Sequence, residues 1–310
     1  MPTLDKSIDV IIPVFNGAKY IAEAINSVDN QTLRPRTIIV VNDGSTDQTT
    51  NLVKKYQKQA KCKIILYSKN NGGLSSARNY GIKKSTAGLL AFLDADDLWL
   101  PTKLEKQLEL FNKPSYKNLG VAFCDYEMID ENGKVDQSIP RSRLDQSSRG
   151  NIYTKLLEGN KVAGSGSGVL IKREVFQKVG YFDENLPAAE DWDMWLRIAR
   201  EFDFDYVSQK LVQIRRHQTN MSNSEFRLLK GITLVLNKLV EMGIYSKKYL
   251  RSYSMRVIKL ALCNPLDYHQ TRYLVSVMSS KLKSKIWNNG SLLVDIFKAP
   301  VVLLLNKFRI

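Results

Sequence analysis

The sequence predicts an α/β protein whose mostly parallel sheet is flanked by helices. Apolar, β-branched runs at 9–14, 37–41, 63–67 and 89–93 alternate with stretches in which apolar residues recur at helical spacing. This alternation favours a doubly wound parallel sheet, because a crossover helix brings the next strand into the same direction. Continuous apolar runs also indicate strands that are buried on both faces.

Carboxylates gather at the end of the fourth run. Asp94, Asp96 and Asp97 directly follow Leu89–Leu93. In parallel α/β sheets, ligands bind beyond the carboxyl ends of the strands. Carboxylates this close repel one another unless a cation lies between them, and oxygen ligands favour Mg²⁺ or Mn²⁺. The stretch therefore predicts a metal-dependent ligand site, and the alternative is an acidic turn in which Asp97 caps a helix.

The chain after the fourth strand is less regular. Further strands are expected at 120–129, 169–171, 204–207 and 212–215. The segment 138–151 is rich in Ser and Arg and poor in apolar residues, so we expect a loop over the site, with the glycine-rich loop 164–168 beside it.

A second acidic segment begins a predicted helix. Glu190 and Asp191 precede apolar residues that recur at i, i+3, i+4 and i+7 from Trp192 onward. The positive end of a helix favours a charged carboxylate, which keeps Asp191 available as a proton acceptor. The alternative is that both acidic residues are ordinary members of a first helical turn.

Charge divides the chain into two predicted domains. Residues 1–220 carry 31 Lys and Arg against 27 Asp and Glu, whereas residues 221–310 carry 15 against 4. We expect 1–220 to form the catalytic domain and 221–310 a basic, mainly helical region. Basic regions attract nucleic acid or anionic lipids. No nucleic-acid recognition motif occurs in this region, so we expect no nucleic-acid partner.

Composition also predicts the compartment. Cys62, Cys124 and Cys263 are odd in number and widely spaced, which suits a reducing cytosol. The amino terminus lacks the apolar core of a signal peptide, and no window reaches the roughly 18 apolar residues of a spanning helix. Basic residues within 281–309 surround apolar and aromatic ones, as in interfacial helices. We therefore expect a cytoplasmic protein that lies on the inner face of an anionic membrane, the alternative being a helical cap on the core.

Five motifs occur in order between residues 10 and 192. They are Val10–Asn16, Val41–Asp47, Gly73–Asn79, Asp94–Asp97 and Glu190–Trp192. This ordered set resembles the inverting family 2 glycosyltransferases with the GT-A fold. The resemblance implies transfer of a sugar from a nucleoside-diphosphate donor, expected to be a UDP-sugar, to a hydroxyl of a glycan or lipid-linked acceptor. Bacterial surface polysaccharide synthesis is the setting that it implies.

The resemblance also implies a donor site. Pro13, Phe15 and Asp43 resemble the pocket for the nucleotide base, in which Asp43 accepts the ring N–H. Arg78 is expected to contact the base or ribose side of the donor, and Asp94 the ribose and the metal. Asn42, just before Asp43, stands where the family often has a second Asp, and its amide retains the capacity to hydrogen bond.

The remaining roles concern the metal and the acceptor. Asp96 resembles the direct ligand of a Mn²⁺ or Mg²⁺ ion, and His217 resembles an element that completes metal or diphosphate binding; a solvated loop histidine is the alternative. Asp191 resembles the catalytic base. Asp97, Glu190 and Trp192 are expected behind these groups or on the acceptor side.

Two other classes of protein share some of these features. A sugar-phosphate nucleotidyltransferase needs a glycine-rich phosphate loop with a basic residue after the first strand, and Phe15–Ala18 offers none. A non-catalytic lipid- or nucleic-acid-binding protein would depend on the basic region 221–310. The acidic cluster 94–97 disfavours nucleic acid near the first domain.

Overall fold

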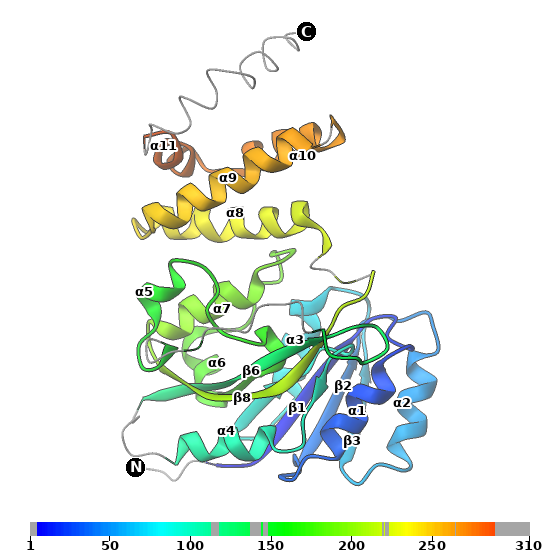
Figure 1. Ribbon diagram of the computed structural model, residues 1–310. Helices are drawn as coiled ribbons and strands as arrows, with labels where there is room; N and C mark the ends of the chain where they lie inside the picture. Colours follow the sequence, from blue (N-terminus) through cyan, green and yellow to red (C-terminus); the bar gives the residue numbers. More distant parts are fainter. Residues whose placement is uncertain are drawn as a thin grey trace. The chain divides into compact units, whose positions relative to one another are not determined.

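The computed structural model describes residues 5–112, 118–136, 144, 148–218, 220, 223–263 and 265–288 (Figure 1). The chain forms two compact units. The first contains Met1–Leu186 and Glu190–Asn220, and the second contains Pro187–Ala189 and Met221–Ile310. Most of the expected loop 138–151 and the apolar segment 291–305 lie outside the described residues.

An eight-stranded sheet forms the centre of the first unit, in the order β3-β2-β1-β4-β7-β6-β8-β5. Its strands are β1 (Ile8–Val14), β2 (Thr37–Asn42), β3 (Lys63–Ser68), β4 (Leu89–Phe92), β5 (Leu98–Trp99), β6 (Leu119–Ile129), β7 (Val169–Lys172) and β8 (Asp203–Arg215). Strand β1 is parallel to β2 and β4, β2 to β3, and β6 to β8, whereas β7 and β5 run antiparallel to their neighbours. The prediction of a mostly parallel sheet is confirmed.

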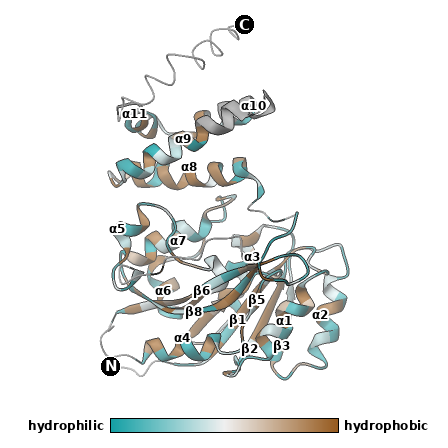
Figure 2. Ribbon diagram, viewed as in Figure 1, coloured by the Kyte–Doolittle hydropathy of each residue, from teal (hydrophilic) through white to brown (hydrophobic). Residues whose placement is uncertain are grey.

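Helices cover both faces of this sheet. They are α1 (Ile21–Asp29), α2 (Thr49–Gln57), α3 (Leu74–Lys84), α4 (Lys103–Phe111), α5 (Tyr153–Leu156), α6 (Arg173–Val179) and α7 (Glu190–Ala199). On one face, α1, α2 and α4 pack against side chains such as Val10 and Ile38. On the other face, α3 approaches β1 so closely that a Cβ at Gly81 would lie 2.5 Å from Ile11. Figure 2 shows the strands as predominantly hydrophobic, as burial on both faces requires.

One local prediction was wrong, and two short elements were not predicted. One strand, β8, occupies 203–215 where two short strands were expected, because its pairing with β6 continues through a register shift near Cys124 and Asp125. The short strand β5 was not expected, since only two residues pair with β8. The glycine-rich loop contains a 3₁₀ turn, η2 (Ser165–Gly168).

The second unit is helical, as expected. It contains α8 (Glu225–Glu241), α9 (Lys247–Cys263), α10 (Pro265–Val277) and α11 (Ser280–Asn288). Its buried apolar side chains include Leu229, Ile232, Leu236, Leu239, Tyr253, Val257, Leu274 and Leu282. The Ser224 side chain accepts a hydrogen bond from the Arg227 N–H and caps α8. None of the helices in the described ranges is long and apolar enough to span a membrane.

A lysine lies in the core of the first unit. Lys103 of α4 is fully buried, with its Nζ 3.9 Å from the Trp99 ring centroid and 2.8 Å from the Gln107 side-chain oxygen. Burial lowers the pKa of Lys103 from 10.5 to about 8. Gln107 in turn donates to the carbonyl oxygens of Ala122 and Gly168. These contacts attach α4 to β6 and to the η2 turn.

The depressed pKa of Lys103 predicts how stability changes with pH. Between pH 8 and 10.5 the unfolded chain binds more protons at this lysine than the folded chain, so the free energy of unfolding rises with pH. From pH 7 to pH 9, we expect the natural protein to gain about 1 kcal/mol relative to Lys103→Met. Urea unfolding at both pH values measures this difference. The control Lys106→Met, on the exposed side of the same helix, retains Lys103 and should gain as much as the natural protein between the two pH values. An equal pH response in all three proteins would contradict the prediction.

Candidate active site

The carboxyl end of β4 delivers three carboxylates to one edge of the sheet. The chain turns tightly after β4, with the Asp97 N–H donating to the Asp94 carbonyl oxygen over 3.1 Å. The adjacent strands β1 and β2 end at the same edge. The expected gathering of acidic groups beyond the strand ends therefore occurs in the structure.

Arg78 of α3 connects this acidic turn to α7. Its guanidinium donates to Asp94 over 2.7 Å and to Glu190 over 2.9 Å, and only 1% of its side chain is exposed. It also lies over the Phe182 ring at 5.4 Å. Burial alone lowers the pKa of Arg78, but the negative charges of Asp94 and Glu190 raise it above its ordinary value. Arg78 is therefore a permanent cation that holds two carboxylates.

Ser167 joins two parts of the acidic turn. Its hydroxyl donates to Asp97 over 2.6 Å and accepts from the Asp94 N–H over 3.1 Å. The Trp99 indole N–H donates to the Ser167 carbonyl oxygen over 2.9 Å and holds the serine in place. The η2 turn thus sets the conformation of the loop that follows β4.

Asp97 is directed inward. Its carboxylate also accepts the Arg215 N–H over 3.1 Å, and the residue is only 5% exposed. Burial, together with the charges of Asp96 and Asp94, raises the pKa of Asp97 well above its usual range. Helix α4 begins later, after Thr102, without a side-chain cap. The alternative in which Asp97 caps a helix is therefore wrong.

Asp96 lies beside a histidine from the end of β8. Its Oδ2 is 2.9 Å from His217 Nε2 and 3.4 Å from the Asn220 side-chain nitrogen. Burial and the charge of Asp94 raise the pKa of Asp96, whereas the His217 hydrogen bond lowers it. The Tyr20 ring lies 5.1 Å from the imidazole. The structure thus brings His217 to the acidic turn across 121 residues of sequence.

Arg215, a buried arginine near His217, also contacts the acidic turn. It is 1% exposed and donates to the Asp96 carbonyl oxygen over 3.0 Å and to Glu23 over 2.8 Å. Its guanidinium lies 4.6 Å from the Tyr20 ring centroid. Arg216, the next residue, is exposed. Of the two arginines, only Arg216 is therefore placed to meet a ligand from solution.

The Asp96–His217 pair fits a divalent cation. Two adjacent ligands of an octahedral ion, each at about 2.1 Å, lie about 3 Å apart, which agrees with the observed separation. Within the described ranges, no group of three or more His, Cys, Asp and Glu side chains is arranged to hold a metal. Mg²⁺ commonly takes one or two protein ligands and completes its shell with water and substrate phosphates. The residues therefore fit an ion that binds together with a diphosphate.

Asp191 lies in the first turn of α7. Its Oδ2 accepts from the Ser165 hydroxyl over 2.7 Å and from the Asn160 amide over 2.9 Å, and its Oδ1 accepts the N–H of Trp192 over 2.7 Å. Three donors thus orient this carboxylate. Ser165 has a positive φ of 48°, a conformation that non-glycine residues seldom adopt and that tends to persist at functional sites.

The neighbours of Asp191 are turned away from solvent. Glu190 is 8% exposed, and burial and the nearby charge of Asp191 raise its pKa, whereas Arg78 lowers it. Trp192 is 2% exposed, and its indole N–H donates to the Leu156 carbonyl oxygen over 2.7 Å. Glu190 and Trp192 were expected either behind the site or on the acceptor side. Both residues are buried in the structure.

The residues expected at the nucleotide base lie at the ends of β1 and β2. Pro13 pairs with Val41 in the sheet, and Phe15 is 53% exposed just beyond it. Asp43 is 3% exposed, and its carboxylate accepts from Lys69 over 2.6 Å and from the N–H groups of Gly72 and Gly73. A ring N–H that bonds to Asp43 must therefore share a carboxylate that already has three partners.

The sequence profile of glycosyl transferase family 2 matches residues 9–180, more than half of the chain. This chain belongs to that family. It is therefore a glycosyltransferase, and the alternatives of a nucleotidyltransferase or a non-catalytic binding protein are set aside. The match covers the acidic turn, Arg78 and the η2 turn but ends before α7.

Several glycosyltransferases are similar to this one in sequence. An uncharacterized glycosyltransferase of Rickettsia typhi is 34% identical over 74% of this chain and 70% of its own. One from Nostoc sp. is 35% identical over 86% of this chain and 82% of its own. Escherichia coli WfgD, a UDP-Glc:α-D-GlcNAc-diphosphoundecaprenol β-1,3-glucosyltransferase, is 28% identical over 82% of this chain and 95% of its own.

Solved structures show the same fold. Residues 1–349 of S. aureus TarS in complex with UDP-GlcNAc superpose with a TM-score of 0.64 at 17% identity, covering 91% of this chain and 89% of that one. The mannosyltransferase PcManGT of Pyrobaculum calidifontis, in complex with GDP-Man and Mn²⁺, gives 0.58 at 18% identity over 93% and 80%. The predicted GT-A fold of this glycosyltransferase is confirmed.

Sequence patterns did not single out several residues that shape this candidate site. They are Tyr20, Asn160, Ser165, Ser167 and Asn220. The side chains of these residues contact site residues that are distant from them in the sequence, so no local pattern marks them. The glycine-rich composition of 164–168 was the one available signal, because a tight turn allows a serine to approach a carboxylate closely.

The buried position of Arg78 predicts a large effect on stability. Arg78→Leu leaves Asp94 and Glu190 without their cation, so we expect the free energy of unfolding to fall by about 3–5 kcal/mol. Arg78→Lys should fall between this variant and the natural protein, because an ammonium lacks the fork that reaches both carboxylates. Urea unfolding measures the change. Arg34→Leu removes an exposed arginine as the control, and equal stability of the two leucine variants would refute the prediction.

Proposed function

We propose that this glycosyltransferase transfers a sugar from a UDP-sugar to a hydroxyl, with inversion at the anomeric carbon. The observation that carries the proposal is the placement of one oriented carboxylate, Asp191, near a separate acidic turn that contains Asp94 and Asp96. Arg78 bonds to both Asp94 and Glu190, so a single side chain fixes the two groups relative to each other. One group thus serves the acceptor and the other the leaving diphosphate.

The donor is proposed to lie across the ends of β1, β2 and β4. The exposed ring of Phe15 offers a face for stacking the base, and Asp43 offers an acceptor at the wall of the base pocket. Asp94 is the ribose contact, since it is the partly exposed member of its ion pair. Arg78 acts by holding Asp94 and not by touching the donor, which revises its expected role.

Asp96 and His217 would hold a Mn²⁺ or Mg²⁺ ion together with the diphosphate oxygens. When bound, such an ion neutralises the charge that develops on the leaving diphosphate. The complex of PcManGT with Mn²⁺ supports metal use in this fold. The exposed Arg216 adds a second positive charge near His217.

The chemical step needs a base behind the acceptor hydroxyl. The hydroxyl oxygen bonds to the anomeric carbon while the bond from that carbon to the diphosphate oxygen breaks, and the hydroxyl proton passes to the Asp191 carboxylate. Attack from the face opposite the leaving group gives inversion. Ser165 and Asn160 fix the carboxylate before the substrate arrives, which lowers the entropic part of the barrier.

The acceptor is proposed to be a glycan or a lipid-linked sugar of bacterial surface polysaccharide synthesis. The name of WfgD, whose acceptor is a diphosphoundecaprenol-linked sugar, supports this class. The excess of basic residues in 221–310 supports docking of the cytoplasmic enzyme on an anionic membrane surface where such lipids lie.

Asp191→Asn tests the base. We expect kcat to fall by about 10²- to 10⁴-fold, because an amide accepts no proton from the hydroxyl. Nucleotide release from a panel of UDP-sugars, with Mn²⁺ and a lipid-linked acceptor, gives the rate, and calorimetric titration with UDP should show unchanged affinity. Glu174→Gln, which removes an exposed carboxylate, is the control. Undiminished transfer by Asp191→Asn would exclude this residue as the base.

Asp96→Ala and His217→Ala test the metal site. With Mn²⁺ present, we expect each variant to raise the dissociation constant of UDP by at least about tenfold. In EDTA the variants and the natural protein should bind UDP equally weakly, because the lost contribution belongs to the ion. Glu109→Ala serves as the control. Loss of UDP binding by Asp191→Asn to the same extent would mean that the two roles were misassigned.

A further inference from the structure

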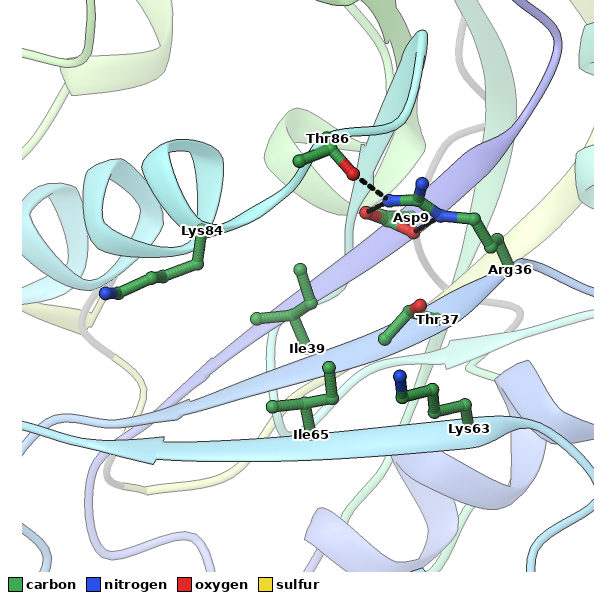
Figure 3. A pocket seen from close by; sticks show the side chains of 8 residues that line it. All are labelled: Asp9, Arg36, Thr37, Ile39, Lys63, Ile65, Lys84 and Thr86. Carbon is green, nitrogen blue, oxygen red and sulfur yellow. Dashed lines mark hydrogen bonds and ion pairs between the residues drawn. The ribbon is translucent and has the colours of Figure 1, made fainter.

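A pocket lies at the opposite edge of the same sheet. Its volume is about 290 Å³, and its lining comes from the first residues of β1, β2 and β3 and from the end of α3 (Figure 3). The lining residues are Asp9, Arg36, Thr37, Ile39, Lys63, Ile65, Lys84 and Thr86. Strand β1 runs from Asp9 here to Val14 at the opposite edge, about 17 Å away at the rise of a strand. The pocket is therefore separate from the donor site.

The pocket exists because α3 ends before it covers the edge of the sheet. Lys84 is the last residue of α3, and the chain then leaves in an extended conformation at Ser85. Beneath this point, Thr37 pairs with Lys63, and Ile39 with Ile65. Figure 3 shows both isoleucines side by side on adjacent strands. They form an apolar floor with polar groups around it.

The carboxylate in the pocket is already neutralised. Asp9 is 1% exposed and accepts from Arg36 over 3.0 and 2.6 Å and from the Ser85 hydroxyl over 2.6 Å. The same guanidinium donates to Thr86 over 2.9 Å. These bonds use Nε and Nη2 of Arg36, and 43% of its side chain is exposed. Asp9 therefore fixes the arginine, whose Nη1 is left for another acceptor.

Two lysines add positive charge without a carboxylate partner. Lys63 is exposed and, within the described ranges, makes no side-chain hydrogen bond or ion pair. Lys84 lies over the Tyr67 and Tyr80 rings, at 5.5 and 5.4 Å, and has no carboxylate partner in the described part of the chain. With one Asp against one Arg and two Lys, the lining has a net charge of +2.

We propose that this pocket binds an anion of the phosphate class, as a phosphate monoester or phosphate headgroup. The fixed guanidinium of Arg36 and the ammonium of Lys63 provide donors for oxygens of one tetrahedral anion. The Lys84 ammonium points away from these two groups, over the Tyr67 and Tyr80 rings, and adds positive charge at longer range (Figure 3). The isoleucine floor suits an apolar or sugar-like substituent on that phosphate, and the volume is close to the lower end for small-ligand sites. The proposal concerns a second site and does not depend on glycosyl transfer.

The test is binding of inorganic phosphate to the full chain at low ionic strength. Amide chemical shifts of 36–39, 63–65 and 84–87 should move, and the dissociation constant should rise by about tenfold in Lys63→Gln/Lys84→Gln, which loses one charge-assisted contact and one further positive charge. Lys54→Gln/Lys55→Gln removes two exposed lysines of α2 and should bind as the natural protein does. Circular dichroism checks that both double variants are folded.

The source of the phosphate is distinguished with vesicles of phosphatidylglycerol. Vesicle flotation that Lys63→Gln/Lys84→Gln weakens and the control variant does not would assign a lipid headgroup, whereas phosphate binding without that difference would assign a soluble phosphate compound. Both outcomes support the site. Equal phosphate binding and equal flotation of the two double variants would overturn it, even if the Asp191 and Asp96 variants behave as proposed.

Discussion

The two ion pairs of Arg78 are the interaction on which the arrangement of this candidate active site depends. One buried guanidinium holds Asp94 from the end of β4 and Glu190 from the start of α7. An arginine is suited to this position because its planar fork reaches two carboxylates at once and stays charged when buried. Removal of Arg78 would leave the buried Glu190 carboxylate without its cation, so the arginine and its two partners form one unit.

Polar and charged partners stabilise the acidic turn, although its carboxylates repel one another. Asp94, Asp96 and Asp97 lie within four residues, and burial and mutual repulsion raise the pKa values of the last two. Each carboxylate has a different partner: Arg78 for Asp94, His217 for Asp96, and Ser167 for Asp97. This division separates the roles proposed for them, since only Asp96 combines with a second metal-binding side chain.

The side chains at the two ends of the parallel strands differ in charge. Beyond the carboxyl ends of the parallel strands lie the carboxylates of the candidate active site, whereas the amino ends carry Arg36, Lys63 and an already neutralised Asp9. The amino ends are open to a ligand because of the length of one helix. Helix α3 reaches its end at Lys84 and leaves the starts of β2 and β3 uncovered.

The sequence by itself determined the α/β class, the positions of the first four strands along the chain and the acidic motifs, because these depend on local periodicity and on residues close in the chain. It did not reveal β5, the single long β8 or the η2 turn, since these depend on pairing with distant segments. Only the tertiary structure decided that Arg78 faces two carboxylates, that Asp97 points to Ser167, and that Ser165 holds Asp191. Direction and burial of a polar side chain are set by the elements packed around it, which no local pattern records.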